Sequence, residues 1–286
     1  MINFRLAGNG ENVLLLHGLF GMGANLKSIS RALSVHFSVY SLDLPDHGSS
    51  SWLSKRDLCI YAEHLIAWLD QNNLRTCHLI GHSLGGKIAM QMALIDPTRF
   101  CSLIIVDIAP VSYPHSHQNV FDAMQELSET KCISRTGTNK ILEKYLNEIE
   151  LIQFLSMSLR NNEEGIYSWI LNYEGLRRDY PLLCLAPDSK GAQYHGPSLF
   201  IRGQRSSFIS KNNEQKFFVE DGIVEFKNNS LSILTSSIFN LEKIDRDYIN
   251  KTIETSEKEL NEDDIRDQKK FLISQKIDVL KSINTN

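Results

Sequence analysis

The chain has 286 residues, a formal net charge of −4 at pH 7 and a sequence pI near 6.1. This length suits one large α/β domain with residues left for an insertion or a tail. The slightly acidic balance gives no basic surface, so we expect no nucleic-acid partner.

Cysteine usage and hydropathy predict a soluble protein of the cytoplasm. The five cysteines are odd in number and include no Cys-X-X-Cys pair, which indicates free thiols in a reducing compartment. The apolar stretch at residues 13–20 is interrupted by His17-Gly18 and lacks a small-residue cleavage site, so it does not indicate a signal peptide. No run of about 18 apolar residues is present, so we expect no membrane span.

The first buried strand is predicted at residues 12–16, and the turn His-Gly-Leu-Phe-Gly follows at residues 17–21. Its glycines let the backbone pass close to a ligand. His17 precedes a glycine at a strand end, where a histidine usually anchors the loop by hydrogen bonds, so we expect no catalytic role for it.

A helix is predicted at residues 24–35 and a strand at residues 37–42, followed by Asp-Leu-Pro-Asp-His-Gly at residues 43–48. Asp43 and His47 are two members of a triad by type, but turn residues packed around Pro and Gly favour a structural role. Asp57 is the expected N-cap of the next helix.

The pentapeptide Gly-His-Ser-Leu-Gly at residues 81–85 lies between a β-rich run at 77–80 and a helical pattern, which is the context of a nucleophile elbow. The sharp turn needs φ > 0 at Ser83, and the flanking glycines lack the Cβ atoms that would collide there. The backbone N–H of Leu84, at the helix N-terminus, is one expected oxyanion donor. The N–H of Leu19 in the upstream turn is the other, with Phe20 as the alternative.

The next buried strand, at residues 101–106, ends at Asp107. The carboxyl ends of parallel strands carry the site in an open α/β sheet, so Asp107 is placed to orient a catalytic histidine. Capping of the following turn is the alternative role for this carboxylate.

Three motifs resemble, in order and spacing, the YbfF-type esterases of the α/β-hydrolase superfamily. They are residues 17–21, Gly-His-Ser-Leu-Gly-Gly-Lys at 81–87, and Val-Asp-Ile-Ala-Pro-Val at 106–111. The likeness covers about residues 10 to 228. It implies an α/β fold with a doubly wound, mostly parallel sheet, and a triad acid that resembles Asp107. The more usual acid position falls at residues 203–208, which contain no carboxylate.

Residues 112–193 interrupt the strand–helix alternation with four helical stretches. Such an all-helical insertion resembles the lid of lipases and esterases. Five apolar residues can line an acyl pocket or form the core of the lid: Ile152, Phe154, Leu155, Trp169 and Ile170. His115 and His117 form a His-X-His at the lid entry without a carboxylate or cysteine cluster, so we expect neither a metal nor a cofactor.

The C-terminal part continues with a strand at 197–202, a helix at 211–219 and a strand at 223–226. At this point the resembled family supplies a Gly-His as the general base. This chain has no histidine after His195. His195 precedes its strand and should lie roughly 20 Å from Ser83, at the other end of the sheet.

Residues 230–286 are predicted to form a charged helical tail, atypical for the family, that can dock on a protein partner. A replaced C-terminus and a frame or exon error both account for this tail. The expected domains are the core at 1–111 and 194–229, the lid at 112–193 and the tail at 230–286.

Three functions remain open from the sequence. The first is a serine hydrolase of small-molecule carboxylic or thio-esters with short to medium acyl groups, in which Ser83 attacks, Leu19 and Leu84 bind the oxyanion, and Asp107 orients a base. The second is a catalytically impaired hydrolase-fold protein that binds a ligand or partner. The third is an active enzyme whose base has moved to His115 or His117.

Overall fold

The computed structural model describes residues 1–203 continuously and then 217–219, 222–227, 230–235, 238–240, 246–260 and 277. The chain forms two compact units, Met1–Ile209 and Ser210–Asn286. The three sequence motifs all lie in the first unit.

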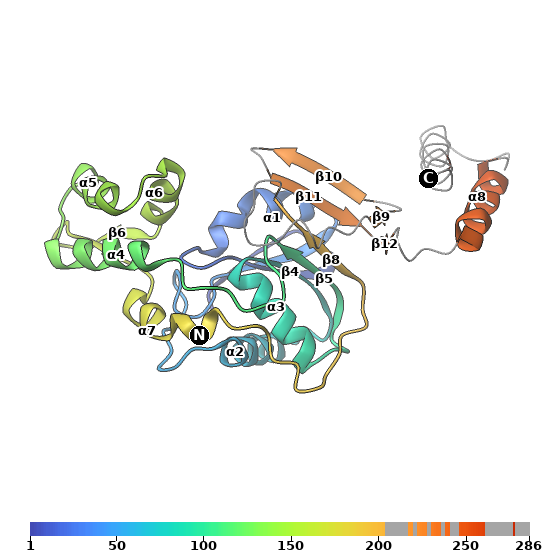
Figure 1. Cartoon of the computed structure of the whole chain (residues 1–286), viewed down its shortest axis with the longest axis horizontal. Helices are drawn as coiled ribbons and strands as arrows, with labels where there is room; N and C mark the ends of the chain where they lie inside the picture. The colour runs from blue at the N-terminus through green and yellow to red at the C-terminus, as the bar shows by residue number, and fades with distance from the viewer. Residues whose placement is uncertain are drawn as a thin grey trace. The chain divides into compact units, whose positions relative to one another are not determined.

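The first unit is built on a six-stranded sheet with the order β1-β3-β2-β4-β5-β8 (Figure 1). Its strands are β1 (Phe4–Ala7), β2 (Glu11–Leu16), β3 (Phe37–Leu42), β4 (Cys77–His82), β5 (Phe100–Val106) and β8 (Ser198–Ile201). All neighbours pair in parallel except β1, which runs antiparallel to β3. The carboxyl ends of β2, β4 and β5 therefore meet at one edge of the sheet.

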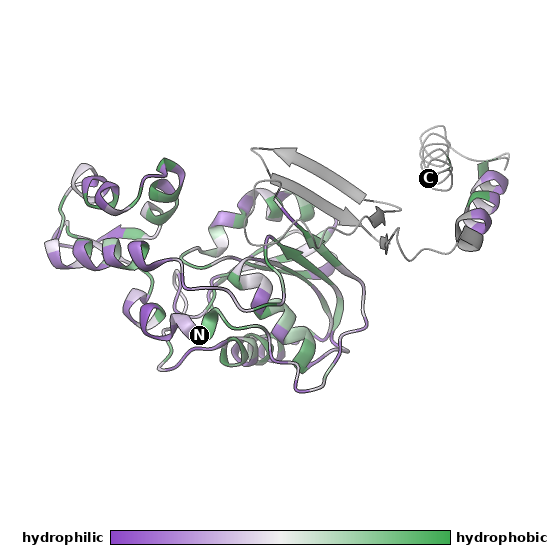
Figure 2. Cartoon of the chain, viewed as in Figure 1, coloured by the Kyte–Doolittle hydropathy of each residue, from purple (hydrophilic) through white to green (hydrophobic). Residues whose placement is uncertain are grey.

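The central strands are apolar along their whole buried length, because helices cover both faces of the sheet. Val13 to Leu16 of β2 are at most 1% exposed, and Figure 2 shows the central sheet as the hydrophobic centre of this unit. The covering helices are α1 (Lys27–Leu33), α2 (Leu58–Gln71) and α3 (Leu84–Ile95), preceded by the 3₁₀ helix η1 (Gly23–Leu26). Helices α2 and α3 lie on one side of the sheet and α1 on the other (Figure 1). The sheet is doubly wound, as predicted.

The helix starts follow the sequence signals. Asp57 caps α2, and its carboxylate accepts the N–H of Ile60 at 2.7 Å. Helix α3 starts directly after Ser83, where the elbow ends. The Asp57 cap therefore sets the residue at which α2 begins.

The insertion after β5 is mainly helical, but it is not all-helical. Its elements are α4 (Gln118–Thr130), α5 (Arg135–Tyr145), α6 (Ile149–Ser156), β6 (Leu159–Asn161), β7 (Tyr167–Trp169) and α7 (Tyr173–Leu183). The predicted helix at 166–176 is replaced at its start by β7, which pairs antiparallel with β6. Asn162 and Gly165 explain the hairpin: the Asn162 side chain accepts two backbone N–H groups of the turn, and Gly165 has φ 77°.

Both ends of the insertion contact Lys87 of helix α3. The buried Lys87 ammonium donates to the carbonyls of Cys184 and Leu185, each at 2.6 Å. Tyr113, at the start of the insertion, donates its N–H to the same Cys184 carbonyl and lies under the ammonium, 4.9 Å from Nζ to the ring centroid. Burial lowers the pKa of Lys87 to about 8. The insertion is thus anchored one helical turn from Ser83.

The second unit contains strands where a helical tail is predicted. Its described elements are β9 (Phe217–Val219), β10 (Gly222–Lys227), β11 (Ser230–Thr235), β12 (Ile238–Asn240) and α8 (Arg246–Leu260). Strand β10 pairs antiparallel with β11, and β12 with β9. The strands at 230–240 correct the prediction of a helix there, because alternating residues such as Leu231, Ile233 and Thr235 have strand periodicity. The predicted helix at 211–219 begins outside the described residues, and its described end, 217–219, is strand β9 and not a helix.

In the described part of the chain, no helix is long and apolar enough to cross a membrane.

Candidate active site

Ser83 lies at the junction of β4 and α3 with φ 50° and ψ −118°, a strained backbone conformation for a residue with a side chain. The neighbouring glycines make the turn sterically feasible. A Cβ on Gly81 would lie 2.3 Å from the Gly85 carbonyl oxygen, and a Cβ on Gly85 would lie 2.3 Å from that of Leu16. The backbone therefore has the geometry expected of a nucleophile elbow.

The turn after β2 passes directly over the serine. A Cβ on Gly18 would lie 3.2 Å from the Cβ of Ser83. The N–H of Leu19 has no hydrogen-bond acceptor within residues 1–203, and neither has the N–H of Leu84 at the first position of α3. Phe20, the alternative donor, is already engaged, because its N–H donates to Nε2 of His47 at 3.2 Å. Within residues 1–203, the N–H groups of the two residues predicted to bind an oxyanion thus have no acceptor.

Asp107 follows β5 with φ 58°, also a strained conformation. Its N–H donates to the Ile201 carbonyl at 2.7 Å, and its Oδ1 accepts the N–H of Gly203 at 3.2 Å. These bonds tie the residue to the end of the neighbouring parallel strand β8. Burial lowers the pKa of His82, the residue before Ser83, and the nearby charge of Asp107 opposes this shift. The carboxylate therefore lies at the same sheet edge as the serine.

No histidine in the described part of the chain hydrogen-bonds to Asp107. His195 precedes β8, and because β8 is parallel to β5 it lies at the opposite end of the sheet from Asp107, as predicted. His117 packs its ring against Phe20, at 5.7 Å between centroids, and bonds through Nδ1 to the Tyr180 hydroxyl. His115 packs against the same tyrosine ring.

His17 and His47 hydrogen-bond to backbone groups of the two loops beside the serine, which agrees with the structural roles expected for them. The Nε2 atom of His17 accepts the Leu44 N–H at 2.9 Å, and its Nδ1 bonds to the Gly18 carbonyl at 2.8 Å. In His47, Nδ1 bonds to the Pro45 carbonyl at 2.8 Å while Nε2 accepts the Phe20 N–H. Both rings must stay neutral to accept in this way. Burial lowers the pKa of His17 to about 3 and also lowers that of His47.

Asp43 also has a structural role. Its Oδ1 accepts the N–H of Gly23 at 2.8 Å, and its Oδ2 accepts the N–H of Ser49 at 2.9 Å. A carboxylate that accepts backbone donors on both oxygens fixes the loops around it and is not available for a catalytic histidine.

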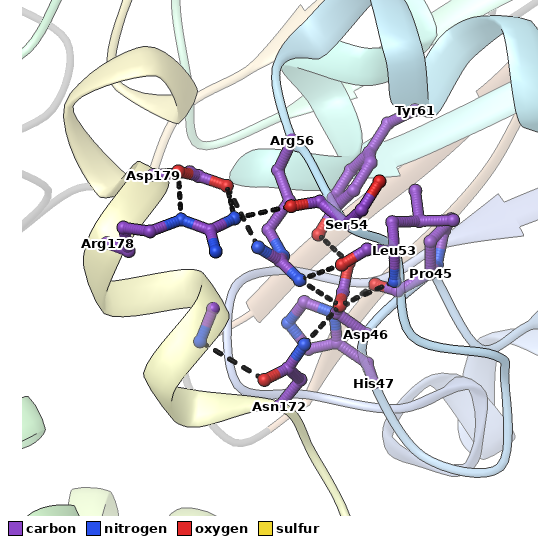
Figure 3. Close-up of polar contacts among 11 residues, drawn as sticks. Pro45, Asp46, His47, Leu53, Ser54, Arg56, Tyr61, Asn172, Arg178 and Asp179 are labelled. Atoms are coloured by element: carbon purple, nitrogen blue, oxygen red, sulfur yellow. Dashed lines mark hydrogen bonds and ion pairs between the residues drawn. The ribbon is translucent and has the colours of Figure 1, made fainter.

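A buried ion-pair cluster joins the core to α7 of the insertion (Figure 3). Asp46 is fully buried, and its carboxylate accepts from Arg56, Tyr61, Asn172 and the N–H of Leu53. The other arm of the Arg56 guanidinium pairs with Asp179 at 2.8 Å. The sequence analysis missed this cluster, because Asn172 and Asp179 lie more than 100 residues from Asp46 and Arg56 along the chain and the four form no motif.

Three of the five apolar lid residues belong to the core. Ile152, Leu155 and Trp169 are buried in the hydrophobic core, and the Trp169 indole donates to the Met124 carbonyl at 3.0 Å. Phe154 and Ile170 are half-buried. Within the described residues, no group of three or more histidine, cysteine or acidic side chains is arranged to hold a metal ion.

Comparison with known proteins identifies relatives of the first unit. A family model described as the alpha/beta hydrolase fold matches residues 11–129. Esterase YbfF of Escherichia coli is 31% identical over 204 residues, which cover 71% of this chain and 78% of that protein. A solved structure described as a marine microorganism esterase is 31% identical, with a TM-score of 0.70, over 74% of this chain and 84% of that one.

A relative of a different kind matches a shorter part of the chain. The ATP synthase epsilon chain of Pelagibacter ubique is 51% identical over 85 residues, which cover 30% of this chain and 65% of that protein. The hydrolase matches leave about this share of the chain over, so we assign the epsilon-like similarity to the C-terminal part that includes Ser210–Asn286.

The elbow, the loop over it and the aspartate at the end of β5 thus occur in a chain that aligns with named esterases over most of their length. The chain belongs to the α/β-hydrolase fold family, as an esterase-type hydrolase.

Proposed function

We propose that the protein is a serine hydrolase of small-molecule carboxylic esters or thioesters with short to medium acyl groups. The observation that carries this proposal is the strained Ser83 at the start of α3, flanked by the unpartnered N–H groups of Leu19 and Leu84. Preorganised donors beside a nucleophile stabilise the charge that develops during acyl transfer.

In this reaction the Ser83 Oγ attacks the acyl carbon while its proton passes to a general base. The carbonyl oxygen becomes an oxyanion that accepts the N–H groups of Leu19 and Leu84. Collapse of this intermediate breaks the bond to the alcohol or thiol, which leaves with the proton. Water then hydrolyses the acyl-serine by the same steps and restores the hydroxyl. Asp107 has the role of orienting the base.

The general base is the missing component. The chain has no histidine after His195, and the segment that follows is similar to a protein of another family. A serine hydroxyl is a weak nucleophile near neutral pH without a neighbouring base. We therefore propose slow turnover, in the range left when one triad member is removed, about 10³–10⁴ over the reaction in water.

A fluorophosphonate probe tests the nucleophile. It phosphonylates an activated serine and loses fluoride, so the protein should be labelled slowly at Ser83. The Ser83→Ala variant should not be labelled, and peptide mapping should find the adduct on the peptide that contains residue 83. Labelling that survives Ser83→Ala would place the nucleophile elsewhere.

The epsilon-like part supports a second proposed function, association with ATP synthase. Its 51% identity to an ATP synthase chain favours a protein partner for this part of the chain, as the sequence analysis expects. The full chain should co-migrate with an ATP synthase depleted of its own epsilon chain, and added epsilon chain should displace it. Absence of co-migration would contradict this proposal.

We also propose a cytoplasmic location, which the cysteines support. All five are free thiols, including the exposed Cys101 and the buried Cys77 and Cys184. Free exposed thiols persist in reducing compartments. Fractionation of the source cells, with detection of the chain by antibody, should find it with the cytosolic proteins.

A further inference from the structure

The insertion contacts the loop over Ser83 at a buried residue, Phe20. This residue is 2% exposed and has φ 65°, a conformation that few side-chain-bearing residues adopt. Its ring packs edge-to-face on Phe121 of α4 at 5.2 Å between centroids. Its carbonyl accepts the hydroxyl of Ser158 at 3.1 Å. The side chains of Phe121 and Ser158 thus fix the position of the loop.

The Ser158 hydroxyl is itself held in place. Ser158 lies between α6 and β6 and is 1% exposed. Its N–H donates to the Leu155 carbonyl at 2.9 Å, and its carbonyl accepts the N–H of Ile170 at 3.0 Å. Because both backbone groups are bonded, the direction of the side chain is fixed by the fold of the insertion.

The hydrogen bonds form a continuous chain from this hydroxyl to Leu19. Ser158 donates to the Phe20 carbonyl, and the same peptide group ends in the N–H of Gly21. That N–H donates to the Gly18 carbonyl at 3.1 Å, and the Gly18 peptide group ends in the N–H of Leu19. Each peptide plane therefore accepts at one end and donates at the other. Aligned hydrogen bonds of this kind polarise one another, by about 10–30% per bond.

We propose that Ser158 is a positioning residue for the reaction: its hydroxyl orients and polarises the Leu19 amide through the peptide groups of Phe20 and Gly18. The inference rests on the proposed role of the Leu19 N–H as an oxyanion donor. It makes the reactivity of Ser83 depend on a residue of the insertion that touches neither the substrate nor the serine.

Ser156 provides a matched control two residues away. It is also buried, at 4% exposed, but its hydroxyl has no hydrogen-bond partner among the residues that the structure describes. Ser158→Ala and Ser156→Ala therefore remove the same atom from the same segment, and only the first breaks the chain to Leu19. Ser158→Thr retains the donor and should restore most of the native behaviour.

The test combines fluorophosphonate labelling and hydrogen exchange on the full chain. Losing an oxyanion donor outright costs about 10²–10³ in rate, so a donor that is weakened but present should cost about tenfold. Ser158→Ala should therefore label Ser83 about tenfold more slowly than the native chain, and its Gly21 amide should exchange faster. Ser156→Ala should match the native chain in both measurements.

The outcomes are distinguishable. Native labelling rates in Ser158→Ala, or unchanged exchange at Gly21, would overturn the inference while leaving the proposed function intact. Equal losses in Ser156→Ala and Ser158→Ala would also overturn it, because they would indicate general loosening of the insertion. A native chain that is not labelled at Ser83 would instead contradict the proposed function, and the catalytic part of the inference with it.

Discussion

The proposed acyl-transfer site has two parts, the nucleophile with its oxyanion donors and the general base. These parts come from different segments of the chain and are held in place differently. Ser83, Leu19 and Leu84 lie within the first third of the sequence, where glycines, neutral histidines and helix α3 fix them by short-range contacts. The base of the resembled family comes after the last strand, and here that part of the chain resembles another protein. The nucleophile side thus depends on contacts within the first unit, whereas the base of the resembled family depends on a segment after the last strand.

The largest expected effect comes from supplying the missing general base. Replacing residues 210–286 by the C-terminal segment of a YbfF-type esterase, with its Gly-His turn, should raise kcat/KM for p-nitrophenyl butyrate by several orders of magnitude. The reason is that the added imidazole takes the Ser83 proton during attack. A replaced chain that folds and hydrolyses no faster than the native one would show that the nucleophile side is not functional.

In the replaced chain, Asp107→Asn should lower kcat by about 10⁴, because loss of the orienting carboxylate has that effect in other triads. Steady-state kinetics with the same ester measures it. Asp43→Asn is the control, since Asp43 accepts backbone N–H groups away from the serine. Similar losses in both variants would indicate a folding effect and contradict a triad role for Asp107.

The core–insertion junction allows a stability test that is independent of catalysis. Arg56→Ala should lower the free energy of unfolding by about 3–5 kcal/mol, because it leaves the buried Asp46 carboxylate without its charged partner. Urea unfolding measures the change. Arg178→Ala removes an exposed guanidinium that pairs with Asp179 and should cost far less, because water screens the pair. Equal effects would contradict the central role of Arg56.

Stability should fall as the pH is lowered from about 6.5 towards 3. Burial lowers the pKa of His17 to about 3, and that of His47 also lies below its usual value. The unfolded chain therefore binds more protons in this range, and each such group contributes a slope of up to about 1.4 kcal/mol per pH unit. Thermal unfolding at several pH values measures the slope.

His17→Gln should reduce this slope, and His36→Ala, at an exposed position, should not change it. A slope unaffected by His17→Gln would mean that the acid sensitivity has another source.

The smallest expected effect is that of His195→Ala. Because His195 precedes β8, at the opposite end of the parallel sheet from Ser83, its removal should leave the labelling rate of Ser83 unchanged. A marked decrease would make His195 a functional residue and would contradict the sheet topology.

The elbow, the Leu19 loop and Asp107 could be predicted from the sequence because each depends on neighbouring residues: glycines around a turn, a strand before it and a helix after it. The hairpin β6–β7 could not, because Tyr167 and Trp169 suit a strand and a buried helix equally well in so short a segment. The Asp46–Arg56–Asp179 cluster depends on long-range packing that leaves no periodic signal. The series of hydrogen bonds from Ser158 to Leu19 runs through backbone groups, which are the same in every residue and leave no signal in the sequence.

Chemical rescue tests most directly the claim that the site is complete except for its base. Added imidazole can take the place of a missing histidine side chain, so it should accelerate labelling of Ser83 in the native chain with saturation, above the background measured with Ser83→Ala. The same addition should have little effect on the chain with the replaced C-terminal segment. Acceleration no greater than that of the Ser83→Ala background would contradict the claim.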